Sequence, residues 1–111
     1  MTTPTRLVAD GGYTALDITT ATNLVGGGSG PNNPNSGTVY RVIVQATAAA
    51  ISYILDSASA TQTAANTILP IPASTPVGTI YTLNWPFFQG LSVVPGSGVT
   101  LAVSYSVGNQ G

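Results

Sequence analysis

The chain has 111 residues, enough for one domain with a modest core, and apolar residues make up 43% of it. Only 5% of its residues are charged, the reverse of the composition that keeps chains disordered. With two arginines and no lysine, the chain cannot form a basic stripe along a phosphate backbone, so nucleic acid is not an expected partner. The net charge of −1 places little repulsion between copies and favours self-association, although a neutral monomer would have the same composition.

Membrane and export signals are weak in this sequence. The first residues, MTTPTRLVADGG, lack the apolar core of a secretory signal peptide. The stretch Val39–Leu55 contains polar residues and is shorter than the roughly 20 apolar residues of a membrane-spanning helix. Cysteine is absent, so the sequence indicates no disulfide and no redox compartment. We therefore expect no membrane partner.

Residues 1–37 have the composition of an irregular N-terminal arm. Two short apolar patches, Arg6–Ala9 and Ala15–Thr20, precede a run over residues 26–37 that is rich in Gly, Asn and Pro. Gly and Pro disfavour helix and central strand in that run, which predicts a long loop. Thr14 and Asp17 match a helix capping box, but the β-branched residues that follow favour a strand. We place the domain boundary at residue 37, with a β-sandwich domain over residues 38–111.

After residue 37 the pattern changes to short strands separated by turns. The first strand, within Thr38–Thr47, is expected to place Tyr40, Val42, Val44 and Ala46 on one face. Further strands are expected within Ile51–Asp56, Thr67–Ile71, Gly78–Trp85 and Phe87–Val94. The clearest alternation follows the turn at Pro95–Gly98, with one row formed by Val99, Leu101, Val103, Tyr105 and Val107.

No segment sustains the 3.6-residue period of an amphipathic helix. Short strands with turn signals every 8–12 residues or so are typical of two-layer β-proteins. The sequence therefore predicts an all-β fold: a compact antiparallel β-sandwich or jelly roll of about six to eight strands, preceded by the irregular arm.

Side chains that carry out catalysis are scarce. Histidine, cysteine and lysine are absent, which leaves serine hydroxyls without a base and removes thiolates, Schiff bases and the usual zinc ligands. The three carboxylates, Asp10, Asp17 and Asp56, are scattered, and we expect them in turns and caps. The Gly-rich run lacks the Gly-Lys-Ser/Thr ending of a phosphate-binding loop. We expect no catalytic residue, metal site, cofactor or small-molecule substrate, and hence no enzyme.

Aromatic side chains are the remaining candidates for binding. The candidate interface residues are Tyr53, Tyr81, Trp85, Phe87 and Phe88. Adjacent residues of a strand point to opposite faces, so one of the two phenylalanines is expected in the core and the other outside. Three roles stay open for the group: core packing, an intersubunit contact, or a platform for sugar rings.

The C-terminal third has a familiar arrangement. Asn84–Ser106 runs from an aromatic pair after Pro86 through Gly-Leu, a Val-rich strand and a Pro-Gly-Ser-Gly turn to a final Leu-x-Val-x-Tyr-Ser strand. This segment, with Thr38–Val44 as a matching early strand, resembles small virion structural proteins of tailed bacteriophages. The resemblance covers roughly residues 38–107 and consists of strands and turns, with no functional residue to transfer.

This resemblance implies a capsid decoration, or cement, protein. Such proteins are compact β-domains, often homotrimers, that bind the major capsid protein on the outer surface of the virion and stabilise the shell. The alternatives are a phage head fibre or tail module and a carbohydrate-binding or adhesive β-domain. In this interpretation residues 1–37 are an arm that becomes ordered on the shell, so a chain without residues 1–36 is expected to fold but to bind more weakly.

Overall fold

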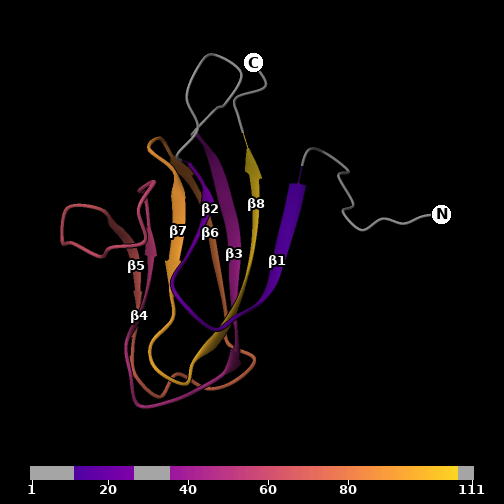
Figure 1. The fold of residues 1–111 in the computed structure, drawn as a ribbon. Coiled ribbons are helices and arrows are strands. Elements are labelled where there is room, and N and C mark those ends of the chain that lie inside the picture. Colours follow the sequence, from indigo (N-terminus) through magenta and orange to yellow (C-terminus); the bar gives the residue numbers. More distant parts are fainter. Residues whose placement is uncertain (1–11, 27–35, 108–111) are drawn as a thin grey trace.

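The computed structural model describes residues 12–26 and 36–107, which form eight strands (Figure 1). The strands are β1 (Gly12–Ile18), β2 (Thr22–Val25), β3 (Gly37–Ala46), β4 (Ser52–Leu55), β5 (Thr67–Ile71), β6 (Ile80–Phe87), β7 (Leu91–Val94) and β8 (Thr100–Val107). No helix occurs among the described residues, so none of them forms a helix that could cross a membrane. The all-β prediction is confirmed.

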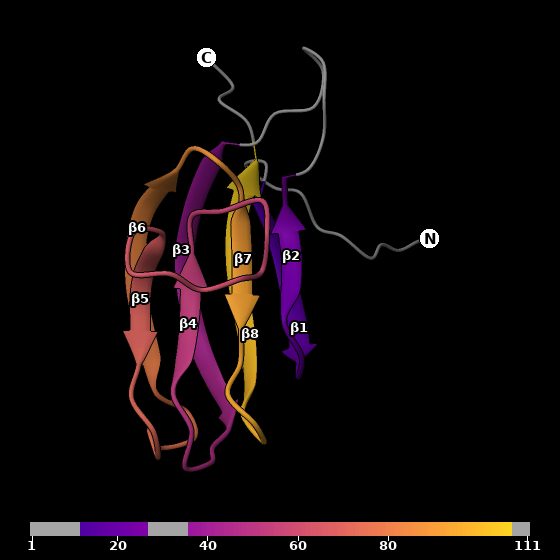
Figure 2. The ribbon, with the colours of Figure 1, turned by 60° about the vertical axis from the view of Figure 1, so that its left-hand side comes forward.

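The strands form two antiparallel sheets packed face to face. Sheet A has the order β1-β8-β3-β6, and sheet B has the order β2-β7-β4-β5. In Figure 2 the strands of sheet B lie in front of those of sheet A. A long hairpin that folds back at the β4–β5 connection would pair β1 with β8, β2 with β7, β3 with β6 and β4 with β5. All four pairs occur in the two sheets. This wrapped hairpin is a jelly roll, one of the two sandwich topologies expected from the sequence.

The core lies between the two sheets and is built from the alternating inner residues of their central strands. Its fully buried side chains include Val39, Val42 and Val44 of β3, Ile54 of β4, Leu91 and Val93 of β7, and Leu101 and Val103 of β8. The alternation predicted for β8 is confirmed, because Val99, Leu101 and Val103 are buried while Tyr105 and Val107 pack against the core. Burial of this apolar area is the main term that stabilises the domain.

A bulge changes the face predicted for the first half of β3. Val39 pairs with Tyr105 of β8 and Arg41 with the adjacent Ser104, so Tyr40 is an extra residue of β3. The other neighbour, β6, is irregular at the same level: Val39 pairs with Trp85 and Arg41 with Thr82, and Asn84 between them has φ 47°, a left-handed conformation that asparagine tolerates better than most residues. Val39 therefore fills the core in place of Tyr40, whose hydroxyl donates a hydrogen bond to Ser106 Oγ. The prediction that Tyr40 shares a face with Val42 was wrong for this reason.

The domain boundary predicted at residue 37 is also corrected. β1 pairs with β8 and β2 pairs with β7, so residues 12–25 contribute one strand to each sheet. Ile18 and Val25 carry this segment into the core, where both are buried. The strand preferred over a helix at Thr14–Asp17 is confirmed as part of β1. The Arg6–Ala9 patch and most of the Gly-rich run, residues 27–35, lie outside the described residues.

Candidate interaction surfaces

The five aromatic candidates do not gather into one patch. Phe87 is fully buried and offers no surface to a partner, whereas Phe88 is 71% exposed, so the predicted opposition of the two rings is confirmed. Tyr81 pairs with buried Val42 and packs against the core from sheet A, while Tyr53 is half-buried on sheet B. Trp85 remains 55% exposed because it lies on β6, the edge strand of its sheet. The surface candidates are thus Phe88 and Trp85.

Hydrogen bonds hold Phe88 in a fixed turn between β6 and β7. Asp56 Oδ1 accepts from the backbone N–H of Phe88 at 3.0 Å and from that of Gln89 at 2.8 Å. The backbone N–H of Ser57 donates to Gly90 O at 3.2 Å, which ties the other side of the same turn. Asp56 is therefore a capping carboxylate, as expected from the sequence, and it presents the Phe88 ring to solvent on a rigid support.

Close backbone approach explains the glycine that follows this turn. Gly90 has φ +143°, and a Cβ at this position would lie 2.5 Å from Val25 O and 2.8 Å from Ser57 O. No side chain fits there, because the ends of β2 and β4 converge on the turn. The turn that carries Phe88 is thus packed by two other segments as well as hydrogen-bonded to one of them.

Replacing the Asp56 carboxylate should loosen this turn. For Asp56→Ala we expect a loss of about 1–2 kcal/mol in the free energy of unfolding, because two backbone donors lose a charged acceptor. Asp56→Asn keeps an oxygen in place of Oδ1 and should lose less. Urea denaturation measures both differences. An alanine variant as stable as the wild type would show that water replaces the carboxylate without cost.

A buried polar cluster lies near the same end of the sandwich. Ser92 is fully buried, and its hydroxyl donates to Ser57 O at 2.8 Å while accepting from Asn23 Nδ2 at 2.9 Å. The Asn23 amide also donates to Leu91 O at 3.2 Å, so it links β2 to β7, and it donates to Val25 O within β2 at 2.8 Å. The Ser92 hydroxyl thus donates one hydrogen bond and accepts one, and Arg41, the one basic residue in the described part of the chain, lies on β3 in the other sheet. The cluster stabilises the strand ends and has no feature of a catalytic serine.

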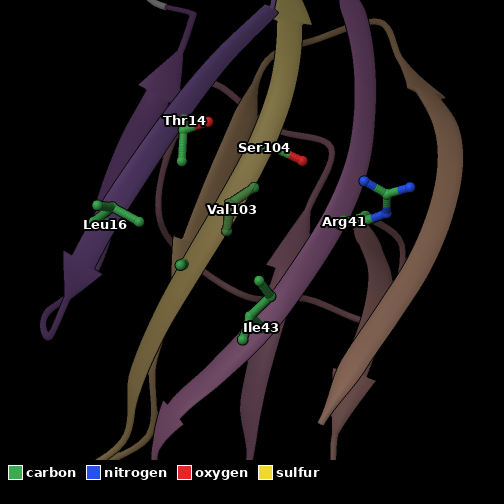
Figure 3. Close-up of a pocket in the computed structure, with 7 residues that line it drawn as sticks. Thr14, Leu16, Arg41, Ile43, Val103 and Ser104 are labelled. Atoms are coloured by element: carbon green, nitrogen blue, oxygen red, sulfur yellow. The ribbon is translucent and has the colours of Figure 1, made fainter. Parts of the chain in front are cut away.

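The outer face of sheet A carries a second surface that sequence reasoning missed. The strand register aligns a polar row, formed by Thr14, Ser104, Arg41 and Thr82, and beside it an apolar row, formed by Leu16, Ala102, Ile43 and Ile80. Between the rows lies a hollow of about 210 Å³, shown in Figure 3. The alternation within each strand indicates which residues face outward. Which of them lie side by side depends on the register between strands, and the sequence does not show that register.

The floor of this hollow is a small side chain with larger neighbours. Ala102 is buried although it points outward, because Leu16 of β1 and Ile43 of β3 flank it. Leu16 itself is 65% exposed. Arg41 lines the hollow, is exposed, and has no carboxylate partner among the described residues.

Two stacked tyrosines lie where β1 pairs with β8. The rings of Tyr13 and Tyr105 are 5.6 Å apart and inclined by 28°. Burial raises the pKa of Tyr105 above its ordinary value of 10.0, and repulsion from the Tyr13 phenolate raises it further. The folded chain therefore holds this proton more tightly than the unfolded chain does.

Alkaline pH should consequently weaken the fold. The stabilisation from protonated Tyr105 is complete below the unfolded pKa of 10.0 and is lost as pH rises through the higher folded pKa. We expect the urea midpoint to fall as pH increases above about 10. In Tyr105→Phe, which keeps the ring and removes the titrating hydroxyl, this fall should be smaller. An identical pH profile in both proteins would exclude Tyr105 as its cause.

Neither a metal-binding cluster in the described residues nor a match to a known protein indicates a function. Within residues 12–26 and 36–107, no three His, Cys, Asp or Glu side chains lie close enough to hold a metal ion. No protein-family model, no curated protein sequence and no solved structure matches this chain. The fold and the two surfaces are therefore the observations that bear on function.

Proposed function

We propose that this protein is a non-enzymatic virion structural protein, a capsid decoration or cement protein that binds the major capsid protein on the outer shell. The observation that carries the proposal is the outer face of sheet A, where two aligned rows of neutral side chains with one charge, Arg41, extend over four strands. Hydroxyl and short apolar groups suit a broad, partly hydrated contact with another protein.

The fold gives the proposal a second line of support. An eight-stranded jelly roll is an architecture that capsid proteins use, as lectins and cupins do, so this support is an analogy of fold. Three of the four edge strands are poorly suited to pairing with a strand of another chain. β2 is short, and β5 and β6 contain Pro70 and Pro86. Such edges favour discrete assembly through faces and turns over open-ended strand pairing.

The same site argues against catalysis as the protein's role. Neither surface contains a base, a thiol or a pair of carboxylates, and Asp56 is engaged by two backbone N–H groups. Recognition of a protein surface needs none of these groups. We therefore propose a role in assembly, with the chain itself and the capsid protein as partners.

Labelling of virions tests this proposal. Antibody raised against the purified protein is applied to particles whose genome encodes the chain, and gold-conjugated secondary antibody is located by electron microscopy. We expect label over the head surface. Label confined to fibres or the tail would replace decoration by the fibre or tail alternative, and particles without label would refute a virion role.

One observation favours a carbohydrate-binding alternative. Trp85 and Phe88 are both more than half exposed, and exposed aromatic rings stack on sugar rings. In this alternative, glycans on an array retain the wild-type protein and do not retain Trp85→Ala. A flat array would leave the protein-binding role as the proposal.

A further inference from the structure

The exposed Phe88 ring projects from the turn between β6 and β7, and the outer face of sheet A contains a hollow. We infer that the protein associates head to tail with copies of itself, the Phe88 ring of one copy entering the sheet A hollow of the next. The inference deepens the proposed role in assembly, on which it rests, because it names the residues through which copies of this chain contact each other.

Phe88 has the properties of an anchor residue. It is the most exposed of the large apolar side chains in the described part of the chain, and Asp56 and Gly90 fix the turn that carries it. A side chain on a rigid support loses little conformational entropy when it is bound. Aromatic residues of this kind dominate the energetics of protein interfaces, where each fills a pocket on the partner.

The hollow has enough volume for such a ring, and part of its lining is apolar. A cavity of about 150 Å³ lined by apolar side chains holds a benzene molecule. The hollow on sheet A, at about 210 Å³, is lined by Ala102 of β8 and by Leu16 and Ile43. Figure 3 shows Leu16 and Ile43 on the strands at either side of β8. A phenyl ring bound there would shield the exposed Leu16 side chain from solvent and would itself become buried.

Charge identifies a second copy as the occupant. Arg41 lines the hollow, and no ion pair engages it among the described residues. Asp56 lies directly behind the Phe88 turn, bound to it by two hydrogen bonds. Entry of Phe88 into the hollow of another copy would therefore bring a carboxylate towards the one cation of that surface, a pairing that an arbitrary apolar partner would not supply.

The positions of the two features determine the kind of assembly. Phe88 lies in the turn that joins the two sheets at one end of the sandwich, whereas the hollow lies on the face of sheet A. A contact between two different surfaces is heterologous, so each copy gives one ring and receives another. Such contacts close into rings when the rotation permits, and a trimer is one such ring.

Complementation between two variants tests the inference. Phe88→Ala removes the ring and keeps the hollow, whereas Leu16→Asp spoils the hollow and keeps the ring. We expect the wild type to oligomerise in sedimentation velocity experiments, each variant alone to be monomeric, and an equimolar mixture of the two to form a 1:1 dimer that grows no further. Both positions are exposed, so near-wild-type urea midpoints are expected and confirm that each variant is folded.

Matched controls are available elsewhere on the surface. Ile51→Ala and Val77→Asp change exposed apolar residues outside both surfaces and should associate as the wild type does. A wild type that stays monomeric at about 1 mM, the weak end of the affinity scale, would overturn the inference. So would a mixture of the two variants that forms no dimer. Shell labelling of virions does not depend on these outcomes, so the inference and the proposed function can fail separately.

Discussion

A variant that lacks residues 1–36 is expected to lose cooperative folding. This deletion removes β1 and β2, and with them the buried side chains of Ile18 and Val25. Burial of each such side chain contributes about 1.5–3 kcal/mol, before the hydrogen bonds of two strand ladders are counted. The total approaches the whole stability of a small domain, about 5–15 kcal/mol. The truncated chain would also expose β7 and β8 as new edges with apolar inner faces.

Near-ultraviolet circular dichroism and urea denaturation measure this loss directly. Deletion of residues 1–11 is the matched control, because it shortens the same end and leaves all eight strands intact. Ile18→Ala, a point change within the same segment, should cost about 2–5 kcal/mol. A cooperative transition in the chain that begins at residue 37 would contradict the fold described here and would restore the interpretation of residues 12–36 as an arm.

The contrast between β8 and β1 explains what was predictable. From Val99, just before β8, to Val107 at its end, every second residue is apolar. In the structure this row faces the core along its whole length. β1 and β2 are shorter, and turn-forming residues surround them. Their stability comes from pairing with β8 and β7, which are distant in sequence. The local sequence of residues 12–25 contains no information about pairing with β7 and β8. An irregular arm was therefore predicted there.

The candidate site shows the same limit. Phe87 and Phe88 were correctly expected one in the core and one outside, although β6 ends at Phe87 and Phe88 lies in the turn that follows. The hollow around Ala102 depends on which residues of β1, β8 and β3 align, and the bulges at Tyr40 and beside Asp17 shift that alignment. Bulges are set by neighbouring strands, so neither the shift nor the hollow was visible in the sequence.

The two adjacent phenylalanines should respond to alanine in opposite ways. Phe87 is fully buried at the end of β6, and its ring extends to Gly37, where a Cβ would lie 2.8 Å from Phe87 Cζ. That Cβ would also lie 2.0 Å from Ser106 O, so the Gly37 backbone packs closely against both the ring and β8. A ring removed from such a site leaves a cavity that the surroundings cannot fill. We expect Phe87→Ala to lower the free energy of unfolding by about 3–5 kcal/mol.

Phe88→Ala, one residue further on, should change the free energy of unfolding by no more than about 0.5 kcal/mol, because the ring is in solvent and the backbone N–H still reaches Asp56. Urea denaturation of the two variants gives the stability difference, and sedimentation of the same samples gives the effect on association. Phe87→Leu, which refills most of the cavity, should fall between Phe87→Ala and the wild type. Equal losses in both alanine variants would mean that Phe88 is packed in the native state. Its exposed ring would then be unavailable to a partner, and self-association through it would be excluded.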